Sequence, residues 1–529
     1  MKDLIEQDFG AIADLIRAHA QAAPERRALV EDASGGAPRV LSYGALDALM
    51  DRVAAALQRE GVKPGEAIAI CATMSATYAA VFLGALRAGV AVAPLAPGAS
   101  PASLARMVAD AQARFVFTDA ATAPTLGPAP ADGPTRVLLD GAAEAGTPLD
   151  AWLAPAGTRP QPVQAEPGWP FNIIYSSGTT GEPKGIVQGH GMRWAHVRRG
   201  AAYGYGPETV TLLSTPLYSN TTLVVFFPTI AFGGTVVLLP KFDAATYLRL
   251  AQAHRVTHTM LVPVQYQRLM ARPDFGQHDL ASFHMKFCTS APFSAALKAD
   301  VLARWPGGLV EFYGMTEGGG TCILNAHEHP DKLHTVGQPS QGHDIRLIDE
   351  AGREVPPGEA GEVVGHSAGM MTGYHRQPEK TREAEWFDPA GKRFIRTGDI
   401  GRFDADGFLT LFDRRKDMII SGGFNIYPSD LEAVLREHPA VADAAVVGVP
   451  SAEWGETPAA FVVLRAGAAA EPEAIRQWAN ERVGKTQRLS SLRLLDELPR
   501  SAIGKVLKRE LRELHGVPLA GAATGSARG

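Results

Sequence analysis

The chain has 529 residues, of which 46% are hydrophobic and 20% are charged, and this composition is typical of a globular protein rather than of a disordered or fibrous one. Its length predicts about two to four domains and a core large enough to be stable without crosslinks. Lys and Arg number 51 against 56 Asp and Glu, so the formal net charge is −5. That balance argues against a protein that binds nucleic acid through a basic surface.

Three cysteines, Cys71, Cys288 and Cys322, lie far apart in the chain. They therefore predict neither a disulfide framework nor a metal site of closely spaced cysteines, and they favour a reducing compartment. Residues 1–20 mix acids with apolar residues and lack the basic start of a signal peptide. The most apolar stretch, 223–239, is interrupted by a proline and two glycines, so we expect a buried strand, helix and strand there. We expect a cytoplasmic protein without an integral membrane segment.

Helices and strands alternate from residue 9 to about residue 119. The spacing of apolar residues predicts helices over residues 11–23 and 42–61, followed by short strands over residues 67–72, 90–95 and 114–119. Alternation of this kind indicates a parallel sheet covered by helices. Residues 120–170 are rich in Ala, Pro and Gly, and we expect a surface excursion there with one strand at 135–141.

Strands continue in the second half of the chain, at residues 235–240, 257–263, 285–291 and 309–314. After Gly337 short strands alternate with turns, which predicts a small β subdomain. From Lys416 onward the pattern predicts a compact α+β unit of about 110 residues. The expected fold class is α/β. A large N-terminal domain (1–415) contains helix-covered, mostly parallel sheets plus the small β subdomain, and a small α+β C-terminal domain (416–529) follows.

Residues 175–185, Tyr-Ser-Ser-Gly-Thr-Thr-Gly-Glu-Pro-Lys-Gly, follow an apolar strand at 171–174. The glycines permit a tight turn in which several backbone N–H groups point the same way, as in a phosphate-binding loop. Hydroxyl groups and one positive charge are available from Ser176, Ser177, Thr179, Thr180 and Lys184. The loop does not have the spacing of a Walker A motif. The alternative is a flexible surface loop.

Four segments, 175–185, 311–319, 396–428 and 499–505, resemble in order and spacing the motifs of the adenylate-forming superfamily. That superfamily includes acyl-CoA synthetases, aryl-CoA ligases, luciferases and non-ribosomal adenylation domains, and weaker similarity extends upstream to about residue 11. The resemblance implies a carboxylic acid:CoA ligase. Such an enzyme uses ATP to form an acyl-adenylate and then transfers the acyl group to coenzyme A, so ATP, Mg²⁺ and coenzyme A are the expected cofactors.

The segment 311–319 contains the residues that the resemblance assigns to the nucleotide. It implies that Tyr313 packs on the adenine, with Gly314 and Met315 beside it. Thr316 and Glu317, which follow what we interpret as a Tyr-Gly turn, are expected to bond the α-phosphate and to hold Mg²⁺, respectively. A carboxylate oxygen is a suitable ligand for this hard cation. Taken alone, the segment could instead be a strand-to-helix turn capped by Thr316.

The segment 396–428 is expected to bind the ribose and to connect the two domains. Asp399 is suited to accept hydrogen bonds from both ribose hydroxyls, and Arg414 resembles the arginine that reaches the ribose and phosphate. Without the resemblance, Asp399 would be interpreted as a turn residue, and its pairing with Arg414 as a surface ion pair of little energetic value. The resemblance also implies a hinge at Lys416, about which the C-terminal domain swivels. Gly422 and Gly423 are expected to line the tunnel for the pantetheine arm of coenzyme A, where the alternative is a glycine bulge in an edge strand.

Lys505 follows a glycine just before the last predicted helix. The resemblance implies that its ammonium group bridges the substrate carboxylate and the α-phosphate in the transition state. Lys505, Thr316 and Glu317 are therefore the predicted catalytic residues. The alternative is an exposed lysine at the start of a helix.

The acid pocket is the least specific part of the pattern. Many members of the superfamily have an aromatic residue and then a histidine after a Pro-Leu pair, whereas this chain has Tyr218, Ser219 and Asn220, so that Ser219 replaces the histidine. Further expected walls are Ser290, Ala291, Gly318, Gly319 and Gly320. Because consecutive glycines leave space, an aromatic or medium-chain acid is favoured. Tyr218 and Met315 could equally be core residues.

Three other functions remain as alternatives to a CoA ligase that acts on an aromatic or medium-chain acid. They are an adenylating enzyme that loads a carrier protein, a long-chain fatty acyl-CoA synthetase, and a catalytically inactive nucleotide sensor. The run His327, Glu328, His329 is interpreted as a polar loop, and no transition metal is expected. A homodimer is compatible with the sequence.

Overall fold

The structure is a computed structural model that describes residues 2–516 except 33–36, 129–132, 142–145, 177–182, 415–416, 422–423, 452–453, 485–486 and 502–503. The chain forms two compact units, Met1–Arg346 with Val364–Thr397 and Leu347–Val363 with Gly398–Gly529. We call these the large and the small unit. Residues 398–415 thus group with the C-terminal residues, whereas the sequence pattern assigns them to the N-terminal domain.

The large unit contains a nine-stranded sheet in the order β16-β15-β14-β13-β12-β10-β11-β1-β2. Its strands are β1 (Arg27–Glu31), β2 (Arg39–Ser42), β10 (Val210–Leu213), β11 (Thr235–Leu238), β12 (His258–Leu261), β13 (Met285–Cys288), β14 (Gly308–Met315), β15 (Gly318–Asn325) and β16 (Gln338–Pro339). The central strands are parallel, and β2, β15 and β16 pair antiparallel at the two edges. The expected mostly parallel sheet is therefore confirmed.

An eight-stranded sheet of the same unit has the order β19-β9-β8-β4-β3-β5-β6-β7. Its strands are β3 (Ala67–Cys71), β4 (Ala91–Pro94), β5 (Phe115–Thr118), β6 (Thr135–Leu138), β7 (Thr147–Pro148), β8 (Pro170–Ser176), β9 (Lys184–Gly189) and β19 (Gly373–Tyr374). The excursion 120–170 thus adds two edge strands, β6 and β7, rather than one. Strands β8 and β9 flank residues 177–182 and pair antiparallel.

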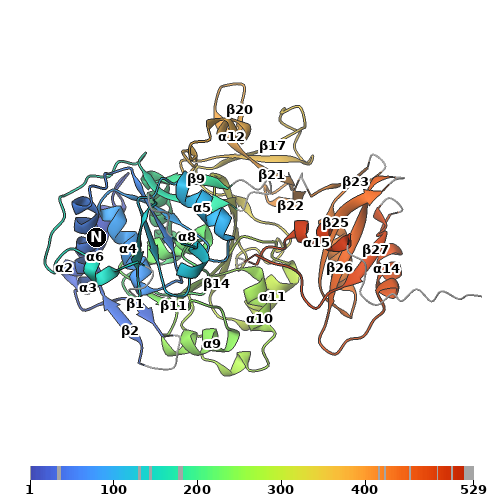
Figure 1. Cartoon of the computed structure of the whole chain (residues 1–529). Helices are drawn as coiled ribbons and strands as arrows, with labels where there is room; N and C mark the ends of the chain where they lie inside the picture. The colour runs from blue at the N-terminus through green and yellow to red at the C-terminus, as the bar shows by residue number, and fades with distance from the viewer. Residues whose placement is uncertain are drawn as a thin grey trace, which may run out of the picture. The chain divides into compact units, whose positions relative to one another are not determined.

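Helices pack on both sheets (Figure 1). They are α1 (Lys2–Ile5), α2 (Ile12–Ala22), α3 (Tyr43–Arg59), α4 (Ala76–Arg87), α5 (Pro101–Asp110), α6 (Leu149–Trp152), α7 (His190–Gly200), α8 (Asn220–Ala231), α9 (Ala244–Ala253), α10 (Pro263–Met270), α11 (Ala295–Arg304) and α12 (Pro378–Glu383), with 3-10 turns η1 (Ala123–Leu126), η3 (Ala201–Tyr203) and η4 (Phe275–Gln277). The main core contains buried side chains of α3, α4 and α8 together with strands of both sheets. Burial of this apolar area stabilises the unit by about 25 cal/mol per Å².

Short strands after residue 337 form a five-stranded sheet, as the pattern predicts. They are β17 (Asp344–Ile348), β18 (Gly361–His366), β20 (Glu385–Phe387), β21 (Arg393–Phe403) and β22 (Leu409–Arg414).

The small unit has its own sheet in the order β24-β23-β26-β25, with β27 beside β26. Its elements are β23 (Ile419–Ser421), β24 (Phe424–Ile426), α13 (Pro428–Glu437), β25 (Val441–Ser451), β26 (Gly455–Leu464), α14 (Pro472–Asn480), β27 (Ser491–Leu494) and α15 (Lys508–His515). Alternate residues of β25 enter two different clusters: Val446 lies with residues of α13 and α14, and Val447 lies with Leu511 of α15. Burial on both faces explains why the strand is apolar without interruption from Ala444 to Val449.

The expected strand, helix and strand over residues 223–239 is wrong in its first part. Residues Asn220–Ala231 form a single helix, α8, and only β11 follows as a strand. A short apolar run does not distinguish a buried helix from a buried strand. Pro228 lies inside the helix, where it removes one backbone donor, and the Thr229 hydroxyl donates to the Val225 carbonyl at 2.7 Å in the same turn.

All three cysteines are buried and free. Cys71 lies in β3, Cys288 in β13 and Cys322 in β15. Burial raises the pKa of Cys71 to about 12 and also raises the pKa values of Cys288 and Cys322. In the part of the chain that the structure describes, no helix is long and apolar enough to cross a membrane.

The three glycines that open β15 pack closely against Gly365, Gly369 and Ile345, so the volume that a side chain would take at these positions is already filled, and whether these glycines border the acid stays a prediction. A Cβ atom on Gly318 would lie 2.1 Å from the Gly369 carbonyl oxygen, and a Cβ atom on Gly320 would lie 2.4 Å from Ile345. Gly318 and Gly319 also have φ values of 79° and 75°, in the left-handed region. These glycines therefore allow a close backbone approach.

We predict that Gly318→Ala destabilises the protein by about 1–3 kcal/mol more than Gly65→Ala, because only the first substitution adds a clash to the cost of the positive φ. Gly65 is the matched control: its φ is +86° and no atom lies within 4 Å of a built Cβ. Urea unfolding of both variants measures the difference. Equal midpoints would show that the backbone around Gly369 yields without cost.

Candidate active site

Thr316 and Glu317 are the two turn residues of the hairpin formed by β14 and β15. Tyr313 and Gly314 lie within β14, so neither the Tyr-Gly turn nor the strand-to-helix turn is present. Gly314 is exposed, and Tyr313 is partly buried. The hairpin presents Thr316 and Glu317 together at the end of a strand of the nine-stranded sheet.

A carboxylate and a cation meet at Tyr374, beside this turn. The Tyr374 hydroxyl donates to Glu317 Oε1 at 2.9 Å, and the Lys184 Nζ lies 5.1 Å from the centre of the Tyr374 ring. Lys184 is the first residue of β9, directly after the loop expected to bind phosphate. Burial, and secondarily Glu317, raises the pKa of Tyr374, so the phenol remains a donor. The structure thus brings together two of the predicted residues, Lys184 and Glu317.

Glu317 has a donor set that fits Mg²⁺. One carboxylate oxygen is oriented by Tyr374, and the Glu317 carbonyl accepts from the Met371 amide at 2.8 Å, so the backbone of the turn is fixed. Among the described residues, no group of three or more His, Cys, Asp or Glu side chains could hold a metal ion. Mg²⁺ commonly binds one or two carboxylates together with phosphate oxygens of a substrate, and Glu317 suits that arrangement.

The turn is also held from the eight-stranded sheet. Gln188 in β9 is buried, and its Nε2 donates to the Thr316 carbonyl oxygen at 2.6 Å. The same nitrogen lies 3.4 Å from Asn220 Oδ1 at the start of α8. Asn172 in β8 donates to Gln188 Oε1 at 2.9 Å and so fixes the orientation of the amide.

Arg193 in α7 completes this network as a fully buried cation. Its guanidinium donates to Asn172 Oδ1 at 2.9 Å and to Gln188 Oε1. It also lies 5.9 and 5.7 Å from the ring centres of Phe171 and Phe227. Burial lowers the pKa of Arg193 to about 9. A buried charge must be well hydrogen-bonded to be tolerated, and here two side-chain amides provide the acceptors.

The predicted walls of the acid pocket come from α8 and from the loop after β13. Ser219 is the N-cap residue of α8 and is buried. Ser290 has a φ of 82°, and its hydroxyl is hydrogen-bonded to that of Thr221 at 2.6 Å, which joins this loop, including Ala291, to the helix. Tyr218 is partly buried, and burial raises its pKa. Whether these residues contact an acid stays a prediction.

Met315 packs against a small core cluster that contains Ile186, Met371, Tyr374 and Ile395. This contact agrees with the alternative that Met315 is a core residue.

Lys505 in the small unit is exposed and follows a tight turn. The Gly504 amide donates to the Ser501 carbonyl at 2.8 Å, and Gly504 has a φ of 75°, which favours glycine. Arg500 donates to the Gly504 carbonyl at 2.5 Å and to Asp443 Oδ2 at 2.5 Å. The arginine therefore ties the lysine turn to β25.

Asp399 lies opposite Arg414 in the ladder between β21 and β22. Several predicted residues lie outside the described part of the chain. These are Ser177, Thr179, Thr180, Lys416, Gly422 and Gly423, together with the side chains of Ser176 and Arg414. Their assigned roles stay predictions.

Sequence reasoning missed Gln188, Arg193, Asn172 and Tyr374. One signal was available: Asn172 is a polar residue within the apolar strand 171–174, and a polar residue in a buried strand needs a partner. Nothing local in the sequence identifies the partners, because Gln188 and Thr316 are 128 positions apart.

Comparison with known proteins gives a consistent result. Residues 16–375 match the AMP-binding enzyme family, and residues 430–505 match the AMP-binding enzyme C-terminal domain. The chain is 32% identical to a 4-coumarate–CoA ligase-like protein (number 9) of Oryza sativa subsp. japonica, over 96% of this chain and 93% of the relative. It is also 32% identical to a feruloyl-CoA synthase of Amycolatopsis sp., over 90% and 94%. The amide bond synthetase McbA from Marinactinospora thermotolerans has a similar structure, with a TM-score of 0.82, 28% identity, and coverage of 95% of this chain and 99% of the other.

We predict that Gln188→Glu lowers the affinity for AMP about 5- to 100-fold, because a donor to the Thr316 carbonyl is replaced by an oxygen that repels it. The new carboxylate still accepts from Arg193 and Asn172, so thermal stability should change little. Calorimetric titration with AMP and a thermal melt measure the two effects.

Gln58→Glu is the matched control, because Gln58 donates to the Gln161 carbonyl at 2.9 Å at an exposed site. AMP affinity of Gln188→Glu equal to that of the control would contradict a role of Gln188 in positioning the turn.

Proposed function

This chain belongs to the AMP-binding enzyme family and is an acid–thiol ligase, and from that premise we propose how its residues divide the reaction. In the first step the carboxylate of an acid attacks the α-phosphorus of ATP, and pyrophosphate leaves. In the second step the thiol of coenzyme A attacks the acyl carbon of the acyl-adenylate, AMP leaves, and the thiol proton passes to solvent. The favoured acid is aromatic or of medium chain length.

The observation that carries this proposal is the meeting of Lys184 and Glu317 at Tyr374, beside the Thr316 turn. Attack of an anion on a polyanion needs neutralisation of charge and alignment more than it needs an acid or a base. Lys184 supplies a positive charge next to the expected phosphate loop, and Thr316 supplies a hydroxyl for the α-phosphate. Glu317 would hold Mg²⁺, which neutralises phosphate charge when it is bound.

Lys505 supplies the second cation in this proposal. Arg500 links the Gly504 carbonyl, next to Lys505, to Asp443, while the Lys505 side chain itself is exposed. An ammonium group on an exposed turn is suited to approach a nucleotide and to bridge the carboxylate and the α-phosphate. A hinge at Lys416 would move this turn between the two steps.

The acyl-adenylate has a good leaving group, so attack by the thiol requires access rather than a strong base. Gly422 and Gly423 are assigned to the passage for the pantetheine arm, where the absence of side chains allows close backbone contact. Asp399, whose backbone is fixed in the β21–β22 ladder, and Arg414 are assigned to the ribose.

We predict acid-dependent release of pyrophosphate from ATP and Mg²⁺ when the protein is supplied with benzoates, cinnamates and fatty acids of four to sixteen carbons. Aromatic or medium-chain acids should give the highest kcat/KM. With coenzyme A present, chromatography should detect the thioester and AMP. A thioester formed only on a holo carrier protein would show that the acceptor is the carrier protein rather than coenzyme A. A preference for the longest acids would indicate a long-chain synthetase. No pyrophosphate release with any of these acids would indicate a catalytically inactive nucleotide sensor.

We predict that Lys505→Ala slows the adenylation step by at least about 10²–10³-fold, the value of one preorganised donor. The same variant should still convert supplied acyl-adenylate to thioester, because the bridge to the α-phosphate is needed only in the first step. Lys63→Ala is the control for loss of an exposed lysine. If both half-reactions fall equally in Lys505→Ala, the assigned role is wrong.

A further inference from the structure

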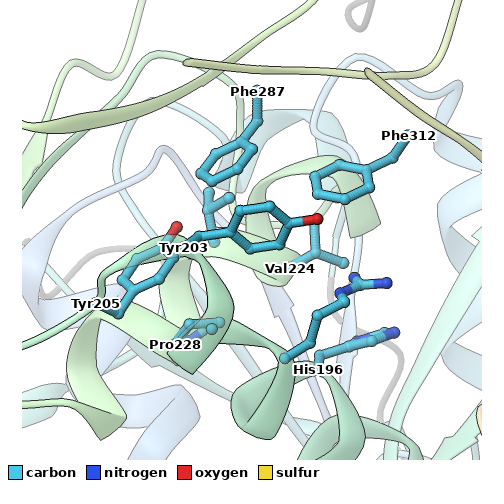
Figure 2. Close-up of a pocket in the computed structure, with 10 residues that line it drawn as sticks. His196, Tyr203, Tyr205, Val224, Pro228, Phe287 and Phe312 are labelled. Atoms are coloured by element: carbon cyan, nitrogen blue, oxygen red, sulfur yellow. The ribbon is translucent and has the colours of Figure 1, made fainter. Parts of the chain in front are cut away.

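A small cavity lies between α7, η3, α8, β13 and β14 of the large unit (Figure 2). Rings of Tyr203, Phe287 and Phe312 line one side, with ring centres 5.2 to 5.8 Å apart. Val224 and Pro228 of α8 line another side. The volume is about 10 Å³, which is room for about one water-sized group.

One charged side chain, Arg199 near the end of α7, also lines this cavity. Its guanidinium lies 4.9 Å from the centre of the Phe312 ring. Among the described residues, no hydrogen bond to the guanidinium and no carboxylate within salt-bridge distance is present. Burial lowers the pKa of Arg199.

The fully buried Lys and Arg side chains among the described residues of the large unit have acceptors within the protein. Arg87 pairs with Asp47 and Asp51, and Lys298 pairs with Glu311. Lys286 donates to three backbone carbonyls in the segment 305–307. Arg199 is partly buried, so its guanidinium has lost part of its hydration without gaining a hydrogen-bond acceptor from the described residues, and an acceptor in the cavity would offset that loss.

The neighbours of Arg199 do not supply the missing negative charge. Burial raises the pKa of Tyr203 and Tyr205, so both phenols remain neutral. Burial likewise lowers the pKa of His196 far below its usual value and that of His343 to about 4, so both rings are neutral as well. The carbonyl end of α7 gives only a weak negative field.

The cavity lies at a suitable depth for the far end of an acid. Asn220, at the start of α8, is joined through Gln188 to the Thr316 carbonyl. Val224 and Pro228 lie one and two turns further along the helix, about 6 and 12 Å at 1.5 Å per residue. An aromatic acid whose carboxylate reacts beside Thr316 would therefore direct its opposite end toward Arg199.

We propose that Arg199 binds a hydrogen-bond-accepting oxygen, of a phenol or a carboxylate, at the end of the aromatic acid opposite the reacting carboxylate. This inference rests on the proposed function. The cavity has room for one such oxygen, the aromatic rings contact the ring that carries it, and the guanidinium gains the acceptor that the protein does not provide. Arg199 is thus a residue that determines the specificity for the acid.

The test compares cinnamate, 4-hydroxycinnamate and 4-carboxycinnamate in acid-dependent pyrophosphate release by the full chain. A hydrogen bond to a charged group predicts a kcat/KM about 10- to 100-fold higher for at least one oxygenated acid than for cinnamate. The acid that gains more identifies the source of the oxygen, phenol or carboxylate. Equal or higher kcat/KM for cinnamate overturns the proposal.

Three variants connect this preference to the guanidinium. Arg199→Met should reduce the ratio of kcat/KM values to about one, and Arg199→Lys should restore part of it. Arg198→Met is the matched control, because Arg198 is the adjacent exposed arginine of α7, 3.8 Å from Asp8, and it should keep the full ratio. An unchanged ratio in Arg199→Met overturns the proposal.

Two further readouts separate the possible failures. Arg199→Met removes an unpaired charge, so the melting temperature of the variant should equal or exceed that of the unchanged protein. A lower ratio of kcat/KM values between the oxygenated acid and cinnamate then does not reflect unfolding. If no acid of any class yields pyrophosphate, the proposed function itself fails. If acids are activated but with the same ratio in both proteins, only the assignment of Arg199 fails.

Discussion

The amide of Gln188 is the connection on which the geometry of the large unit's active site depends. It lies in a strand of the eight-stranded sheet and donates to a hairpin turn of the nine-stranded sheet, 128 positions away in the chain. Asn172 and Arg193 fix which end of the amide faces the turn. Because all three side chains are buried and bond to one another pairwise, loss of any one leaves a polar atom of the other two without a partner, and networks of this kind hold a single arrangement.

Four buried or partly buried cations of the large unit differ in what surrounds their charge. Arg193 donates hydrogen bonds to the side-chain amides of Asn172 and Gln188 and orients them. Lys298 forms an ion pair with Glu311 and so holds α11 to β14. Lys184 lies over the Tyr374 ring, and its proposed acceptor is a phosphate of the substrate. In our proposal, Arg199 likewise obtains its acceptor from a ligand, the far end of the acid. Because burying a charge is costly, each of these cations needs an acceptor, which the protein supplies to Arg193 and Lys298 and which, in our proposal, the acid supplies to Arg199.

The sequence predicts the order of elements well, because the alternation of strands and helices is a local signal. Short motifs also assign roles to Thr316, Glu317 and Lys184, but they place the turn at Tyr313–Gly314 rather than at Thr316–Glu317. The sequence does not predict their contact through Tyr374 or the role of Gln188, because those contacts join residues far apart in the chain. The helical state of α8 and the close packing at Gly318 were missed for a related reason: both depend on what surrounds the segment rather than on its own residues.

The burial of Cys71, Cys288 and Cys322 has a practical consequence. Thiolates are the form that reacts with disulfide reagents and maleimides, and shielded thiols with raised pKa values supply almost none at neutral pH. A colorimetric titration of sulfhydryl groups in the native state will therefore report the consumption of the small-molecule thiol, without a background signal from the polypeptide.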